Sequence, residues 1–276
     1  MPSDTVETTI PSSTPGVDLF VAVNRIEAAR AVVVIVHGLA EHLGRYDLVT
    51  SELNEAGCSV YRFDNQGHGR SGGERGYLDN FQSFIDDADL LVEKAREENP
   101  GLPVFMLGHS MGGFITAAYG VKYPGKLKGQ VLSGAAVIQL PLFEAFKDVD
   151  FEKEPRVKVP NALSELICRD KAVVTAYDED PLVLKETCQK LLGEVFINGA
   201  GWLTDKLPEY AYPCLILHGD DDQIVTPDAS RYMADHIASQ DKTLKMYPGF
   251  FHEILNENGR DEVVADITEW IWARLG

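Results

Sequence analysis

The sequence lacks any hydrophobic run near the ~20 residues that a helix needs to cross a bilayer. Its first 16 residues, MPSDTVETTIPSSTPG, have neither the basic start nor the apolar stretch of a secretory signal peptide. The four cysteines form no CxxC pair, so no zinc or redox motif is predicted. We therefore expect a soluble, cytoplasmic protein without a transmembrane segment, and leave a Cys168–Cys188 disulfide open.

The sequence also has few positively charged residues relative to its acidic ones. There are 25 Lys and Arg residues against 43 Asp and Glu residues, and the net charge is −18. The phosphates of nucleic acids and anionic membrane surfaces repel such a chain. No nucleic-acid partner is expected, and solubility accounts for the acidic surface without a specific partner.

Short apolar runs alternate with helical patterns along most of the chain. The run AVVVIV at 31–36 is apolar throughout, as in a strand that is buried on both faces. Similar but shorter runs predict strands at 58–63, 104–107, 130–132, 214–217 and 243–247, and helical spacing predicts helices across 81–95 and 263–271. This alternation predicts an α/β fold with a mostly parallel central sheet and helices on both faces.

The alternation stops between residues 136 and 206, where the sequence shows helical pieces and no clear strand. We interpret this segment as a short helical cap, or lid, inserted over the sheet. Residues 1–135 and 207–276 would then form the core domain. Apart from the Ser/Thr/Pro-rich first 16 residues, no low-complexity segment or repeat is found.

The pentapeptide GHSMG at 108–112 fits the pattern G-x-S-x-G, between the strand-like VFML and the helical FITAAYGVKY. Strand, turn and helix in this order are typical of the nucleophile elbow of α/β-hydrolases, and a chance match rarely has this context. Ser110 is therefore the predicted nucleophile. The amide of Met111 would lie at a helix N-terminus, where it can stabilise an oxyanion.

A serine nucleophile needs a histidine base, and the base needs an acid that fixes its tautomer. In this fold the chain order is serine, acid, histidine. His252 follows the last predicted strand and precedes the last helix. It is preferred over His218, which precedes the acid candidates, and over His236, which lies within a helical run.

The acid is expected in the loop HGDDDQIV at 218–225, which follows a predicted strand. Asp220 and Asp221 suit turn formation, because aspartate bonds its own backbone. Asp222 precedes the apolar pair Ile224 and Val225, which should anchor the loop in the core. We prefer Asp222 to Asp221 on this pattern.

A second backbone donor for the oxyanion is predicted where the first buried strand ends in HGL at 37–39. The amide of Leu39 is the candidate, and Gly38 would let the backbone approach the acyl carbonyl. His37 and His68 are read as structural. The loop DNQGHGRS at 64–71 has neither a Walker ending nor the spacing G-x-G-x-x-G, so no nucleotide site is predicted.

Four segments carry a resemblance to a known family. HGLAEHLGRY at 37–46 looks like HGxxEHxxRY, FDNQGHGRSGG at 63–73 like a GHGxSxG loop, SQDKTLKMYPGFFHEILNE at 239–257 like a base segment, and GHSMGG at 108–113 is identical to a nucleophile motif. Together they resemble the monoacylglycerol lipase and lysophospholipase family of α/β-hydrolases, within the serine aminopeptidase-type group. The resemblance implies Ser110, Asp222 and His252 as the triad, with Leu39 and Met111 as oxyanion donors.

The resemblance implies a monoacylglycerol lipase that releases a fatty acid and glycerol through an acyl-enzyme. A lysophospholipase or a general carboxylesterase is the alternative. A non-catalytic ligand receptor on the same scaffold is disfavoured, because all three catalytic groups are present. No metal or cofactor is expected.

Apolar residues of the insertion are the candidate acyl-binding site, although some must only seal the insertion onto the sheet. The predicted substrate-binding residues are Phe143, Phe146, Leu163, Leu166 and Ile167. Each buried CH₂ contributes ~0.8 kcal/mol, which favours a single-chain lipid ester. Residues 141–206 hold 13 acidic and 9 basic residues, so a neutral head group is expected over an anionic one. A transient contact of the insertion with a lipid surface would fit this substrate.

Overall fold

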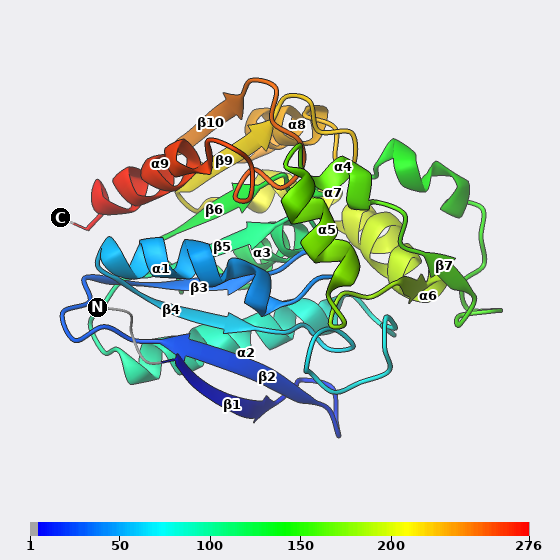
Figure 1. The fold of residues 1–276 in the computed structure, drawn as a ribbon, viewed down its shortest axis with the longest axis horizontal. Helices are drawn as coiled ribbons and strands as arrows, with labels where there is room; N and C mark the ends of the chain where they lie inside the picture. Colours follow the sequence, from blue (N-terminus) through cyan, green and yellow to red (C-terminus); the bar gives the residue numbers. More distant parts are fainter. Residues whose placement is uncertain (1–4, 276) are drawn as a thin grey trace.

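The computed structural model describes residues 5–275 and is built around one eight-stranded sheet (Figure 1). The strand order is β1-β2-β4-β3-β5-β6-β9-β10. The strands are β1 (Thr5–Pro11), β2 (Asp18–Asn24), β3 (Ala31–Val36), β4 (Cys58–Phe63), β5 (Val104–His109), β6 (Gly129–Ser133), β9 (Cys214–Gly219) and β10 (Lys242–Tyr247). From β4 to β10 all neighbours pair in parallel, which confirms the predicted sheet.

Strand β3 shows why its sequence is apolar throughout. Val32, Val34 and Val36 belong to one hydrophobic cluster, whereas Val33 and Ile35 belong to a second cluster on the opposite face. Successive side chains of a strand point to opposite faces, so a strand covered on both sides needs apolar residues at every position. The six predicted strands are all present, with ends that differ by at most a few residues.

Helices cover both faces of the sheet, as predicted (Figure 1). Helices α1 (Asp47–Glu55) and α9 (Arg260–Trp272) pack on one face. Helices α2 (Gln82–Glu98), α3 (Met111–Lys122) and α8 (Asp228–His236) pack on the other. The active-site loops predicted above all begin where a parallel strand ends, so the topology brings them to one edge of the sheet.

Within the Ser/Thr/Pro-rich first 16 residues the structure has a strand that the sequence did not predict. Strand β1 begins at Thr5 and pairs antiparallel with β2 over seven residues, and β2 in turn pairs antiparallel with β4. Strand β1 lies at the sheet edge and is largely exposed, so its threonine-rich sequence carries no burial signal. Residues 1–4 lie outside the described part.

The insertion of residues 136–206 lies between β6 and β9, and extends past the ends of the strands (Figure 1). It contains η2 (Pro141–Phe146), α4 (Ser164–Ile167), α5 (Lys171–Glu179), α6 (Gln189–Gly193), η3 (Glu194–Gly199) and α7 (Ala200–Lys206). The expectation that it holds no strand was wrong, because β7 (Lys158–Pro160) pairs antiparallel with β8 (Glu186–Cys188). Three residues are too few to show a period-two pattern in the sequence.

All four cysteines are buried and free, so Cys168 and Cys188 do not form a disulfide. Cys58 and Cys214 are the first residues of strands β4 and β9. Among residues 5–275, no helix combines the length and the apolar character that a membrane span requires.

Candidate active site

Ser110 occupies a sharp turn between β5 and α3. Its backbone has φ 56° and ψ −116°, a conformation that costs a non-glycine residue ~1–3 kcal/mol. The two flanking glycines make the turn sterically feasible: a Cβ on Gly112 would come within 2.1 Å of the Val36 carbonyl oxygen, and one on Gly108 within 2.1 Å of the Gly112 oxygen. The G-x-S-x-G pattern is therefore the local requirement of this turn.

Asp222 and His252 meet although 29 residues separate them in the sequence. The Nδ1 atom of His252 lies 2.6 Å from Oδ2 of Asp222. The other oxygen, Oδ1, accepts hydrogen bonds from the amides of Ile224 (2.9 Å) and Val225 (3.0 Å). Because Nδ1 donates to the carboxylate, Nε2 is left as the basic nitrogen, and His252 lines the same cavity as Ser110.

The two neighbouring aspartates have different surroundings. Asp220 is exposed and its Oδ1 accepts the amide of Gly249 at 2.5 Å, which closes a turn. Asp221 is also exposed, whereas the Asp222 side chain is fully buried. Of the three, Asp222 is the one that the structure joins to His252.

His218 supports Asp222, a role that the sequence reasoning did not assign. Its Nε2 lies 3.1 Å from Asp222 Oδ2 and 2.8 Å from the Val225 carbonyl oxygen. Both partners are acceptors, so Nε2 carries the proton, and Nδ1 accepts from the hydroxyl of Ser230 at 2.6 Å. The order of residues along the chain excluded His218 as the base but gave no sign of this contact.

The buried histidines around the site differ in their pKa values. It lowers the pKa of His37 and His68 to about 3 and that of His109 to about 4, so these rings are neutral near pH 7. Burial acts on His252 in the same direction. The charge and hydrogen bond of Asp222 nevertheless raise the pKa of His252 above its ordinary value. His252 is thus the ring of this group that is best able to hold a proton during a reaction.

The two predicted oxyanion donors come from the loop after β3 and from the first residue of α3. Among the described residues, neither the Leu39 amide nor the Met111 amide has a hydrogen-bond partner. Met111 is the first residue of α3, where the helix dipole favours negative charge. Ala40, next to Leu39, has φ 66°. Among the described residues other than glycine, Ala40 and Ser110 are the two with positive φ. Such strain concentrates at functional sites.

A known protein family matches most of the chain. The family model described as Serine aminopeptidase, S33 matches residues 27–259. The chain belongs to this family of α/β-hydrolases.

Similar proteins include several lipases. A protein named monoacylglycerol lipase from Mycolicibacterium smegmatis is 39% identical over 250 residues, which cover 89% of each chain. The Homo sapiens monoglyceride lipase is 31% identical over 252 residues, covering 89% of this chain and 83% of its own. The crystal structure of Paleococcus ferrophilus monoacylglycerol lipase superposes with a TM-score of 0.83 at 31% identity, covering 93% of this chain and 99% of that one. The protein is a serine ester hydrolase.

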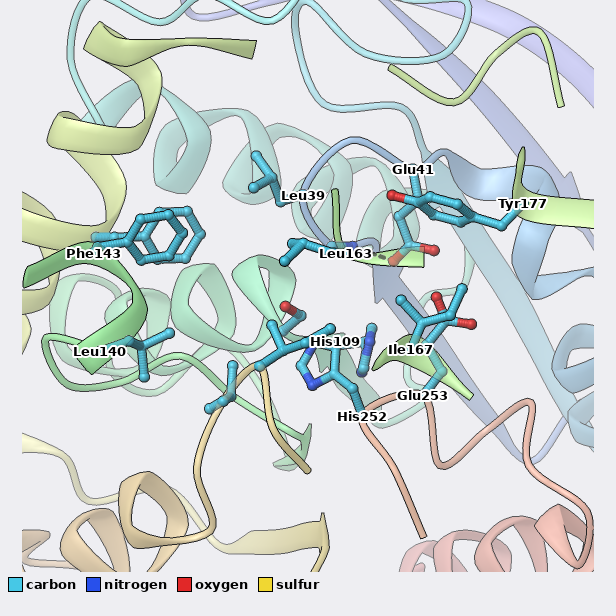
Figure 2. A pocket seen from close by; sticks show the side chains of 15 residues that line it. Leu39, Glu41, His109, Leu140, Phe143, Leu163, Ile167, Tyr177, His252 and Glu253 are labelled. Carbon is cyan, nitrogen blue, oxygen red and sulfur yellow. Dashed lines mark hydrogen bonds between the residues drawn. The ribbon is translucent and has the colours of Figure 1, made fainter. Parts of the chain in front are cut away.

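The hydrolase cavity above Ser110 has two sides of different polarity. Figure 2 shows Phe143 and Leu140 on one side of His252, and Glu41, Tyr177 and Glu253 on the other. A second, mostly apolar cavity adjoins the first, and Leu39, Phe143 and Leu163 line both.

The structure places all five predicted substrate-binding residues in these two cavities. Ile167 lines the cavity of Ser110, Phe146 and Leu166 line the adjoining one, and Phe143 and Leu163 line both. The sequence reasoning missed the acidic side. Glu41 and Glu253 stand within the motif segments at 37–46 and 239–257, but nothing in either segment alone indicates that they face one cavity.

Proposed function

We propose that this hydrolase cleaves monoacylglycerols into a fatty acid and glycerol through an acyl-enzyme. The division of the Ser110 cavity carries the proposal. An apolar side that continues into a second cavity suits one acyl chain, and a polar side suits a small alcohol (Figure 2). Relatives that cover most of the chain carry the name monoacylglycerol lipase, which supports the same substrate.

The proposed mechanism uses Ser110, His252 and Asp222. Oγ of Ser110 attacks the ester carbonyl while Nε2 of His252 takes the serine proton, and Asp222 stabilises the imidazolium. The amides of Leu39 and Met111 stabilise the oxyanion of the tetrahedral intermediate. His252 then returns the proton to the departing glycerol oxygen. Water, activated by the same histidine, releases the fatty acid from the serine.

The head-group side of the cavity carries two carboxylates and one cation behind them. The side chains of Glu41 and Glu253 are each 4% exposed, and both bond the guanidinium of Arg45. Burial alone would raise the pKa of Glu253, but Arg45 holds it well below its usual range. This side is therefore net negative. Glycerol hydroxyls can donate to carboxylates, whereas a phosphate would meet repulsion.

We propose that residues 136–206 form the cap over this site. The segment is bonded to loops on both sides of Ser110: the Leu184 amide donates to the Ala40 carbonyl at 2.8 Å, and the Glu253 amide donates to the Ile167 carbonyl at 2.7 Å. A cap held in this way covers the nucleophile and favours one acyl chain over the three of a triacylglycerol. Leu142 of this segment is 47% exposed, which suits a transient contact with a lipid surface.

Esters with the same acyl chain on different head groups test the substrate. We expect kcat/KM to be highest for the monoacylglycerol, lower for the phosphocholine ester and lowest for the phosphoglycerol ester, with about tenfold or more between the extremes, or ~1.4 kcal/mol. Initial rates on monomeric substrates measure this order. A phosphoglycerol ester that is hydrolysed as well as the monoacylglycerol would identify a lysophospholipase instead.

Hydrolysis should be lost at acidic pH as His252 takes up a proton. The pKa of His252 is raised above its ordinary value, because Asp222, with Glu253 and Glu41, outweighs the opposing effect of burial. Only the neutral imidazole accepts the serine proton, so kcat/KM for a neutral ester should rise with pH and reach half its plateau above pH ~6.5. A pH profile with a nitrophenyl ester measures this midpoint. A midpoint below pH ~6 would contradict the assignment of His252.

A further inference from the structure

Glu41 is a buried carboxylate whose described partners are all hydrogen-bond donors. Its Oε1 accepts hydrogen bonds from the amide of Gly38 at 2.6 Å and from the hydroxyl of Tyr46 at 2.7 Å, and its Oε2 accepts one from the guanidinium of Arg45 at 2.9 Å. Burial, reinforced by Glu41, raises the pKa of Tyr46 well above its ordinary value, so that hydroxyl keeps the proton it donates. A group surrounded by donors in this way is held as a carboxylate in one orientation.

The amide that Glu41 holds belongs to the loop of the proposed oxyanion donor. Gly38 precedes Leu39, and a Cβ on Gly38 would lie 3.1 Å from Cβ of Ser110 and 2.8 Å from Oε1 of Glu41. The backbone of the loop at Gly38 therefore packs closely against both the turn at Ser110 and the Glu41 carboxylate. On the far side of Leu39, the carbonyl of strained Ala40 accepts the amide of Leu184 at 2.8 Å.

Arg45 connects this carboxylate to the loop of the base. Its guanidinium bonds Glu41 and also makes a two-pronged pair with Glu253, the residue after His252. The guanidinium lies 4.7 Å from the ring centre of Tyr177, in helix α5 of the insertion. The side chain of Arg45 is 10% exposed, so these contacts are little weakened by solvent.

We propose that Glu41 is a positioning residue for ester hydrolysis: its carboxylate holds the Gly38 amide and thereby aims the N–H of Leu39 at the oxyanion. Oxyanion donors act only if they are preorganised where the charge develops, and a loop with a strained residue needs an external anchor to keep that position. The inference rests on the roles proposed above for Ser110 and the Leu39 amide. It does not depend on which head group the enzyme prefers.

Two substitutions at Glu41 test the proposal with a short nitrophenyl ester, which has no glycerol to bind. Glu41→Gln keeps a neutral acceptor for Gly38, and Glu41→Leu removes the acceptor. We expect kcat per active site to fall on the order of 10-fold in Glu41→Gln and on the order of 10²-fold in Glu41→Leu. Complete removal of an oxyanion donor typically lowers kcat about 10²–10³-fold. KM should stay within about threefold, since the contact is used in the transition state.

A boronic acid supplies the readout that a merely structural role would not change. Its tetrahedral adduct with Ser110 places an oxygen where the oxyanion forms, so its inhibition constant should rise by the same factor as kcat/KM falls. Active sites are counted by the end point of fluorophosphonate labelling, which removes the effect of unfolded protein.

Glu194→Gln is the matched control. Glu194 is a buried carboxylate that likewise accepts a backbone amide, that of Phe81 at 3.1 Å, and pairs with a cation, Lys190 at 3.4 Å. It does not line the cavity of Ser110. This variant should lower the midpoint of thermal unfolding while kcat per active site and boronate affinity stay within twofold of wild type.

The proposal is overturned if Glu41→Gln keeps both kcat per active site and boronate affinity within twofold of wild type, or if it raises KM alone. Should Glu41→Leu fail to fold, Tyr46→Phe, which removes one donor to the same oxygen, is expected to cost severalfold in both quantities. An unchanged Tyr46→Phe together with an unchanged Glu41→Gln also overturns it. A failure of the proposed function has a different signature: wild type does not hydrolyse the ester, or Ser110→Ala still does.

Discussion

Replacement of Ser110 by alanine is expected to lower kcat for ester hydrolysis by about 10⁴–10⁶-fold while the protein stays folded. Alanine keeps the Cβ, so the turn with φ 56° and the packing of Gly108 and Gly112 are unchanged. What is lost is the oxygen that forms the acyl-enzyme. Residual hydrolysis would come from the oxyanion donors and from substrate binding alone.

Turnover of a monoacylglycerol and of a nitrophenyl ester, together with circular dichroism, measures this result. Wild type should also react with a fluorophosphonate at one serine, and Ser110→Ala should not. Ser51→Ala is the control, because Ser51 is exposed on helix α1, away from the cavity. A Ser110→Ala variant that retains activity within tenfold of wild type would mean that another residue is the nucleophile.

The second large effect is expected at Asp222. Asp222→Asn should lower kcat by about 10⁴-fold. The side-chain oxygen of the asparagine would accept the backbone N–H groups of Ile224 and Val225, so its NH₂ group would face His252. The imidazole would then hold the wrong tautomer, with its proton on Nε2. His218, which donates to the same carboxylate oxygen, would face that NH₂ group as well.

Asp220→Asn and Asp221→Asn are the matched controls, because they make the same change at adjacent positions. Both side chains are exposed and neither bonds His252, so we expect kcat within about threefold of wild type. Asp220→Asn should instead weaken the turn at Gly249, which Asp220 caps. The assignment is refuted if Asp221→Asn is the most damaging of the three.

The acid limb of the pH profile offers a further check on Asp222. Its charge and hydrogen bond are the largest contributions that raise the pKa of His252, against the lowering by burial. Without that charge, burial should prevail, and the residual activity of Asp222→Asn should reach half its plateau at a lower pH than in wild type. A midpoint that is the same in Asp222→Asn and wild type would mean that Asp222 does not raise the pKa of His252.

The sequence by itself determined the elements whose signals are local. A strand covered on both faces must be apolar at every position, and AVVVIV at 31–36 meets that requirement without reference to its neighbours. The turn at Ser110 needs glycines at fixed offsets, because the carbonyl oxygens around it leave no room for a Cβ. Chain order then selected His252 and the aspartate loop.

Only the tertiary structure decided which groups meet. Strand β1 is exposed and polar and exists through its pairing with β2, and β7 and β8 are too short to show a period, so none of the three has a local signal. Composition says nothing of the contact between His218 and Asp222, nor of the guanidinium that joins Glu41 to Glu253 across 212 positions of the chain. Glu41 and Glu253 lie in loops at the ends of two different strands, β3 and β10. The distance between these loops in space is set by the order of strands in the sheet and not by their separation in the sequence.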